Sequence, residues 1–116
     1  MRGSPYWNVV DGSGTTQVTD LLQPEGELDR IYQGVARPLQ VVEPAREHRL
    51  HLAQTGFEDV VVWNPGAARA ASLADLAPGE WRNMLCVEAA RIANPVQLMA
   101  GQRCIGTQRV SMSPRP

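Results

Sequence analysis

Short apolar runs separated by turn residues recur along the chain, with glycine, proline and asparagine between them. Runs of four to eight residues at this regular spacing are typical of antiparallel strands in a sandwich or barrel. The segments expected to form strands are residues 17–19, 30–35, 39–42, 48–54, 60–63, 84–89, 96–99 and 104–111. The pattern therefore predicts an all-β chain built as an antiparallel β-sandwich.

Sustained helical periodicity is hard to find. The best helical candidate is residues 67–76, which are rich in alanine and leucine, although Ser72 and Asp75 could equally cap short turns. We expect one or two short helical turns at most. Residues 5–8 look like a sheet edge or loop that begins abruptly after Met1, and the polar, proline-containing tail 111–116 is expected to be frayed.

Composition limits the chain to one domain, 116 residues long, which can bury a core. The formal net charge of -1 predicts neither a nucleic-acid nor a membrane partner. Because no apolar run reaches the ~20 residues of a membrane-spanning helix and no signal peptide is apparent, we expect a cytoplasmic protein. Cys86 and Cys104 form no close-spaced metal motif, so they are expected to be reduced thiols packed as small apolar groups.

Glu88 is the first candidate for chemistry because it is a single carboxylate in an otherwise apolar strand-like run, residues 84–88. Alternation along a strand places Cys86 and Glu88 on one face and Val87 on the other. Partial burial would raise the pKa of Glu88 and make it a usable general base. The alternative is a structural carboxylate paired with an arginine such as Arg82 or Arg91.

Three further residues are candidates to contact a ligand. Asp29 opens a strand, although an acidic segment such as residues 25–29 more often marks a solvated turn. Trp63 and Asn64 end the strand 60–63, where an indole can stack on a sugar ring and an amide can bind hydroxyls; packing in the core is the ordinary role of tryptophan. His48 and His51 would face opposite sides of a strand, so they are expected to be surface residues and no metal ligands.

These segments together resemble a known family. Residues 61–66, the alanine-rich segment that ends at 75–76, and residues 84–88 resemble the C-terminal part of D-hexose-6-phosphate mutarotases, also called glucose-6-phosphate 1-epimerases, of the galactose-mutarotase-like aldose 1-epimerase group. Residues 27–32 resemble the acidic strand opening of that family. The resemblance runs in order from about Tyr6 to Val110 and is carried by the combination of segments.

The resemblance implies part of a large β-sandwich (the galactose-mutarotase-like supersandwich) that interconverts the α and β anomers of a hexose 6-phosphate or hexose without a cofactor. Glu88 matches the catalytic glutamate of the family and Asp29 its active-site aspartate, with Trp63 and Asn64 beside the substrate. In the implied reaction Glu88 takes the proton of the anomeric hydroxyl while an acid protonates the ring oxygen, and the opened sugar closes on its other face.

The sequence also departs from the family. The histidine that would be the acid and the arginines that would hold the phosphate belong to a region upstream of the match, which leaves residues 1–116 as a single partial domain and Met1 as a possible misassigned start. A non-catalytic carbohydrate-binding module and an inactive gene fragment are the alternatives to an epimerase.

Overall fold

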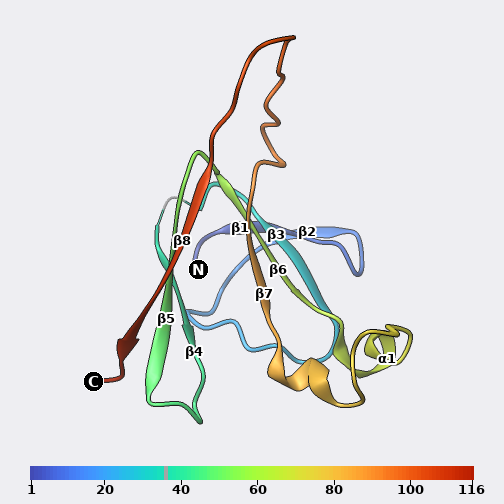
Figure 1. Cartoon of the computed structure of the whole chain (residues 1–116). Helices are drawn as coiled ribbons and strands as arrows, with labels where there is room; N and C mark the ends of the chain where they lie inside the picture. Colours follow the sequence, from blue (N-terminus) through green and yellow to red (C-terminus); the bar gives the residue numbers. More distant parts are fainter. Residues whose placement is uncertain (36) are drawn as a thin grey trace.

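The computed structural model describes residues 1–35 and 37–116, which form two antiparallel sheets (Figure 1). One sheet has five strands in the order β2-β1-β3-β6-β7, and the other has three in the order β4-β5-β8. The strands are β1 Pro5–Asn8, β2 Ser13–Thr16, β3 Leu28–Tyr32, β4 Leu39–Val42, β5 His48–Thr55, β6 Asp59–Asn64, β7 Cys86–Ala90 and β8 Thr107–Pro114. The helical elements are the single turn α1, Gly66–Ala70, and the 3₁₀ turn η1, Glu80–Asn83. The predicted all-β architecture with short helical turns is confirmed.

One face of the five-stranded sheet forms the core. Leu28, Tyr32, Val60 and Val62 alternate with the opposite face along β3 and β6, and all four are buried. Because successive strand side chains point to opposite faces, this even-numbered set fixes the odd-numbered residues of β3 and β6 on the other side of the sheet. We call that second surface the open face, since its side chains are half-buried or exposed except for Asp59 at the start of β6.

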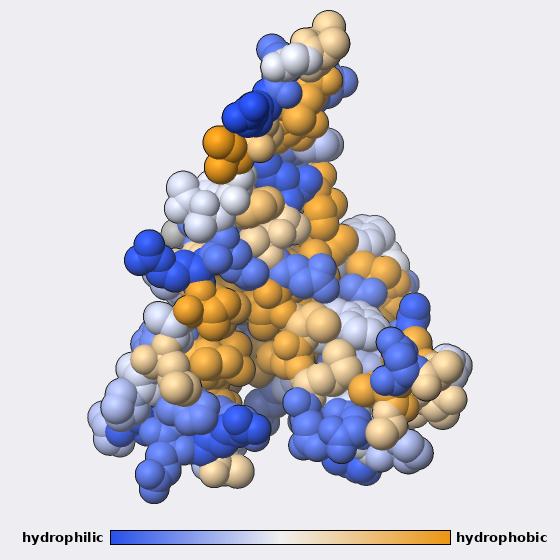
Figure 2. Space-filling view, in the orientation of Figure 1, coloured by the Kyte–Doolittle hydropathy of each residue, from blue (hydrophilic) through white to orange (hydrophobic). Residues whose placement is uncertain are grey.

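The three-stranded sheet packs on the core face. Leu39 and Leu52 of this sheet lie around the same small gap as Val60 and Val87 of the five-stranded sheet. The Gln108 side chain adds a polar link by donating a hydrogen bond to the Val87 carbonyl, 3.0 Å away. From this contact the two sheets diverge toward the bottom of the view in Figure 1. Figure 2 shows apolar residues gathered between the sheets on this side.

The connection between β7 and β8 extends away from both sheets, at the top of Figure 1. Residues 91–106 contain no strand, so the prediction of a strand at 96–99 is wrong. Its apolar side chains, such as Met99 and Ile105, are exposed and give a strand nothing to pack on. We call this segment the arm.

Three further segments differ from the predicted elements. Residues 17–19 form no strand; Gln17 is buried as a side chain that accepts hydrogen bonds from the Tyr32 hydroxyl at 2.9 Å and Arg30 at 3.2 Å. The predicted helix 67–76 ends at Ala70 and continues as turns. The tail is ordered through residue 114 because β8 pairs with β5 as far as Pro114 opposite His48.

Candidate active site

The open face brings three of the predicted site residues together. Asp29 of β3 pairs directly with Trp63 of β6, and Trp63 pairs with Cys86 of β7. Paired residues in antiparallel strands point to the same face, and so does the residue two positions along each strand. Glu88 therefore shares the open face with Asp29, Trp63 and Cys86.

The register also fixes how far apart the two carboxylates lie. Glu88 pairs with Val61, which pairs with Ile31, two residues along β3 from Asp29. The Cα atoms of Glu88 and Asp29 are thus separated by two strand spacings across the sheet and by two residues along the strand direction. In a flat sheet this corresponds to about 12 Å. Trp63 lies between them on the central strand. Glu88 and Asp29 therefore flank an aromatic side chain across three strands.

Glu88 is exposed, contrary to the prediction of a partly buried carboxylate. The physical reason is its position: β7 is the edge strand of the five-stranded sheet, and Glu88 is on its open face. The predicted structural alternative is also wrong. Arg91 pairs with Glu58 at 2.9 Å, and the Arg82 guanidinium lies over the Trp81 ring at 4.6 Å. In the described ranges 1–35 and 37–116, no ion pair or hydrogen bond occupies the Glu88 carboxylate.

Asp29 is half-buried in β3 and is no solvated turn residue. Burial raises the pKa of this carboxyl group; the charge of Arg69 opposes the rise and the charge of Glu27 adds to it. Arg69 itself forms an ion pair with Glu27 at 3.1 Å, which tethers α1 to the start of β3. Asp29 therefore holds its proton more tightly than an ordinary aspartate.

Trp63 is half-buried, so part of its indole remains available on the open face. Trp7 of β1 is on the same face, opposite Ile31, and is exposed. Aromatic surfaces of this kind can stack on the apolar face of a sugar ring. The sequence analysis did not single out Trp7, because its role depends on a strand pairing that the local pattern does not encode.

Asn64 does not join the site. Its side chain belongs to the core face, is 3% exposed, and donates hydrogen bonds to the carbonyls of Trp81 at 2.8 Å and Met84 at 2.7 Å. Its Oδ1 accepts from the Gly66 N–H at 2.9 Å. The amide nitrogen and the amide oxygen of Asn64 are thus both hydrogen-bonded to the backbone, and they hold the segment before β7 against the end of β6. The prediction that Asn64 contacts a substrate is therefore replaced by a structural role.

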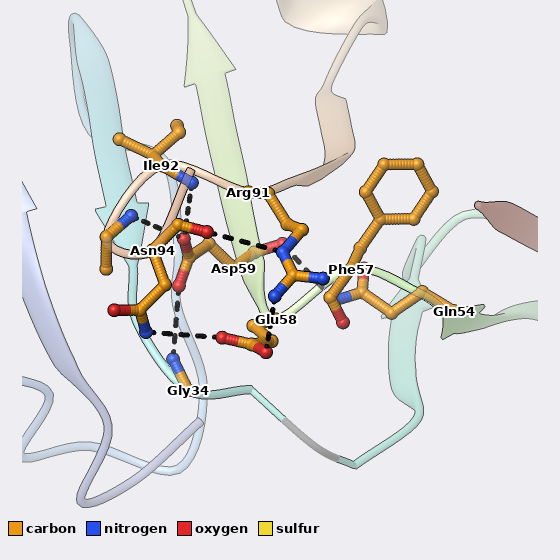
Figure 3. A network of polar contacts seen from close by, with 9 residues as sticks. Gly34, Gln54, Phe57, Glu58, Asp59, Arg91, Ile92 and Asn94 are labelled. Carbon is orange, nitrogen blue, oxygen red and sulfur yellow. Dashed lines mark hydrogen bonds and ion pairs between the residues drawn. The ribbon is translucent and has the colours of Figure 1, made fainter. Parts of the chain in front are cut away.

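A buried carboxylate that the sequence analysis missed lies at the other end of β6. Asp59, 1% exposed, accepts hydrogen bonds from the backbone N–H groups of Ile92 at 2.6 Å, Ala93 at 2.8 Å and Gly34 at 3.3 Å (Figure 3). Beside it, Arg91 binds Glu58. The network joins the root of the arm to the β3–β4 connection. The sequence did contain a signal for this buried carboxylate, because Asp59 directly precedes the apolar run 60–63.

The two histidines lie outside the open face. Both are in β5 of the three-stranded sheet, where His51 Nε2 is hydrogen-bonded to Ser113 Oγ at 2.7 Å. In residues 1–35 and 37–116, no group of three or more His, Cys, Asp or Glu residues is placed to bind a metal.

Cys86 is half-buried on the open face, and burial together with the negative charge of Glu88 raises the pKa of its thiol. Cys104 is exposed in the arm, so it is no packed core residue.

A cavity of the described residues lies away from this face. Its volume is about 440 Å³, and it lies between the first five residues and the β3–β4 connection, where Arg2, Gln33 and Arg37 line it. No helix in the described part of the chain is long and apolar enough to cross a membrane.

Comparison with known proteins gives three concordant matches. A family model described as aldose 1-epimerase matches residues 3–111. The protein named "Putative glucose-6-phosphate 1-epimerase" from Cenchrus ciliaris is 30% identical over 101 residues, which cover 87% of this chain and 30% of the relative. The crystal structure of "a putative mutarotase (YeaD)" from Salmonella typhimurium superposes with a TM-score of 0.88 at 19% identity, over 97% of this chain and 39% of that one. The chain thus spans less than half the length of either protein.

Proposed function

The chain belongs to the aldose 1-epimerase family, and we propose that its open face forms the general-base side of a site that interconverts the anomers of an aldose. The observation that carries this proposal is the shared face of Glu88, Trp63 and Asp29 on three adjacent strands. Glu88 is the base that removes the proton of the anomeric hydroxyl. Because none of the ion pairs among residues 1–35 and 37–116 involves this carboxylate, it is available to a substrate.

Trp63 and Asp29 position the sugar. The half-buried indole provides a stacking surface, and the half-buried Asp29 carboxyl group binds a ring hydroxyl by a hydrogen bond. The reaction needs no cofactor in this scheme, because ring opening and closure only move protons. Hexose 6-phosphate is the proposed substrate class, supported by the name of the Cenchrus ciliaris relative.

A second candidate function is sugar binding without catalysis. It is favoured by the position of both histidines in β5, away from Glu88, because the proposed mechanism also needs an acid for the ring oxygen. Loss of one proton-transfer group typically costs about 10²- to 10⁴-fold in rate. We therefore expect weak anomer exchange from the 116-residue chain alone.

The test compares Glu88→Gln with the wild-type chain. Exchange between the α and β anomers of glucose 6-phosphate is measured by NMR magnetisation transfer, and sugar binding is measured by tryptophan fluorescence. The Gln variant should reduce exchange to the spontaneous rate and keep the affinity within about threefold. The control is Glu47→Gln, an exposed carboxylate at the turn before β5, which should behave as wild type. Equal exchange by wild type and Glu88→Gln would refute the base role, and binding without exchange by either would favour the second function.

A further inference from the structure

The open face continues past the candidate active site as far as β1. Glu88 of β7 pairs with Val61 of β6. Val61 pairs with Ile31 of β3, and Ile31 pairs with Trp7 of β1. Paired residues point to the same face, so these four side chains form one straight row across four strands. With a strand spacing of about 4.8 Å, the Cα atoms of Glu88 and Trp7 lie about 14 Å apart in a flat sheet.

The far end of this row is an indole that is only partly covered. Trp7 is 46% exposed. Its neighbour across the strands is Gly14 of β2, where a Cβ atom would lie 3.5 Å from the Cε3 atom of the indole. A side chain at position 14 would share the space beside the ring. Glycine at this position therefore leaves the indole accessible from the open face.

The floor between the two ends of the row is aliphatic. Val61 and Ile31 are half-buried, and their side chains carry no hydrogen-bonding group. Trp63 and Asp29 form the neighbouring cross-strand row, two residues along β6 and β3. An apolar floor with polar groups at its side suits sugar rings that lie flat, because a sugar ring has apolar C–H faces and a rim of hydroxyl groups.

From these observations we infer that Trp7 forms a second subsite, which binds the second ring of a reducing disaccharide. The position of the first ring rests on the proposed function: with its anomeric carbon at Glu88, it lies over Val61 and beside Trp63. Two strand spacings, about 10 Å, then remain to Trp7, which a single ring leaves uncontacted. The occupant is a neutral sugar ring because the floor is continuous with the proposed site and the row contains no charged side chain beyond Glu88.

NMR titration of the 116-residue chain with cellobiose and with glucose tests this inference. The indole N–H signals of Trp7, Trp63 and Trp81 are assigned by replacing each tryptophan with phenylalanine. Cellobiose should shift the signals of Trp7 and Trp63, whereas glucose should shift the signal of Trp63 alone. Cellobiose should also bind about 2- to 10-fold more tightly than glucose, which is the usual value of one aromatic contact.

Substitutions at Trp7 separate the second ring from the first. Trp7→Ala should lower the affinity for cellobiose to that for glucose and leave the affinity for glucose unchanged within about twofold, whereas Trp7→Phe should keep most of the gain. The control is Leu21→Ala, which removes a 70% exposed apolar side chain outside the strands and should change neither affinity. Both positions are exposed, so the circular dichroism spectra of the variants should match wild type.

Three results would overturn the inference. These are equal affinities of the wild-type chain for cellobiose and glucose, a cellobiose gain that survives Trp7→Ala, and a Trp7 signal that glucose shifts as much as cellobiose does. If Trp63 responds to both sugars and Trp7 to neither, the second subsite is refuted and the proposed function stands. If Glu88→Gln leaves anomer exchange unchanged while cellobiose still shifts Trp7 and Trp63, only the base role of Glu88 is refuted.

Discussion

Replacing Asn64 by alanine tests whether this residue is a structural clamp or a sugar ligand. The amide holds the carbonyls of Trp81 and Met84 and the N–H of Gly66 at 2.7 to 2.9 Å, and the side chain is almost fully buried. Alanine removes all three partners and supplies none. We therefore expect a large loss of stability and no specific loss of sugar binding.

The magnitude follows from the three hydrogen bonds. Each typically contributes about 0.5–1.5 kcal/mol, and a buried group left unsatisfied costs more. The carbonyls belong to half-buried residues and partly regain water, whereas Gly66 is buried. Together they predict a decrease of about 2–4 kcal/mol in the free energy of unfolding. At a urea dependence of about 1–3 kcal/mol per M, the midpoint should fall by at least roughly 0.7 M.

Urea unfolding followed by tryptophan fluorescence measures this shift. Asn64→Asp should be at least as destabilising at neutral pH, because it keeps the acceptor for Gly66 but turns a carboxylate toward two carbonyl oxygens. Asn83→Ala is the control: Asn83 is exposed and makes one 3.3 Å hydrogen bond to Glu80, so its effect should stay within about 0.5 kcal/mol. The reasoning fails if Asn64→Ala is as stable as Asn83→Ala, or if it loses sugar affinity while remaining fully stable.

Two further predictions concern titratable groups on the open face. Burial raises the pKa of Asp29 above 3.8, so folding favours its protonated form. The free energy of unfolding of wild type relative to Asp29→Asn should therefore be highest at low pH and should fall as the pH rises through the raised pKa. Urea titrations at a series of pH values measure this difference. A wild-type curve parallel to that of Asp29→Asn would contradict this. In a Cys104→Ser background, Cys86 should react slowly with a disulfide reagent at pH 8 because burial and the charge of Glu88 raise the pKa of its thiol. Glu88→Gln should speed the reaction, and an unchanged rate would contradict the effect of the Glu88 charge on this thiol.

The strands of the centre of the fold were predictable because their local pattern agrees with their packing. The run 39–42 coincides with β4, the run 48–54 is one residue shorter than β5 at its C-terminal end, and the run 60–63 is one residue shorter than β6 at each end. The sharing of one face by Cys86 and Glu88 was likewise predictable from alternation alone. These features depend on sequence within a single strand.

The failures depend on contacts between distant segments. The burial of Asn64 requires Trp81 and Met84, and the exposure of Glu88 follows from the place of β7 at the sheet edge. The order β2-β1-β3-β6-β7 and the pairing of Asp29 with Trp63 cannot be obtained from local periodicity. The resemblance to the family supplied the roles of Glu88 and Asp29 but could not distinguish Trp63, on the open face, from its neighbour Asn64.

Because Trp63 and Asn64 are adjacent in β6 and point to opposite faces, the alignment of β6 decides which of the two lies on the open face. If β6 slid by a single residue against its partners, the indole would enter the hydrophobic interior and the amide would emerge beside the two carboxylates. The bonds from Asn64 to Trp81, Met84 and Gly66 penalise that slip directly. In the proposed function, the placement of Trp63 beside a bound sugar is thus maintained from the reverse side of the sheet, by the buried amide of Asn64.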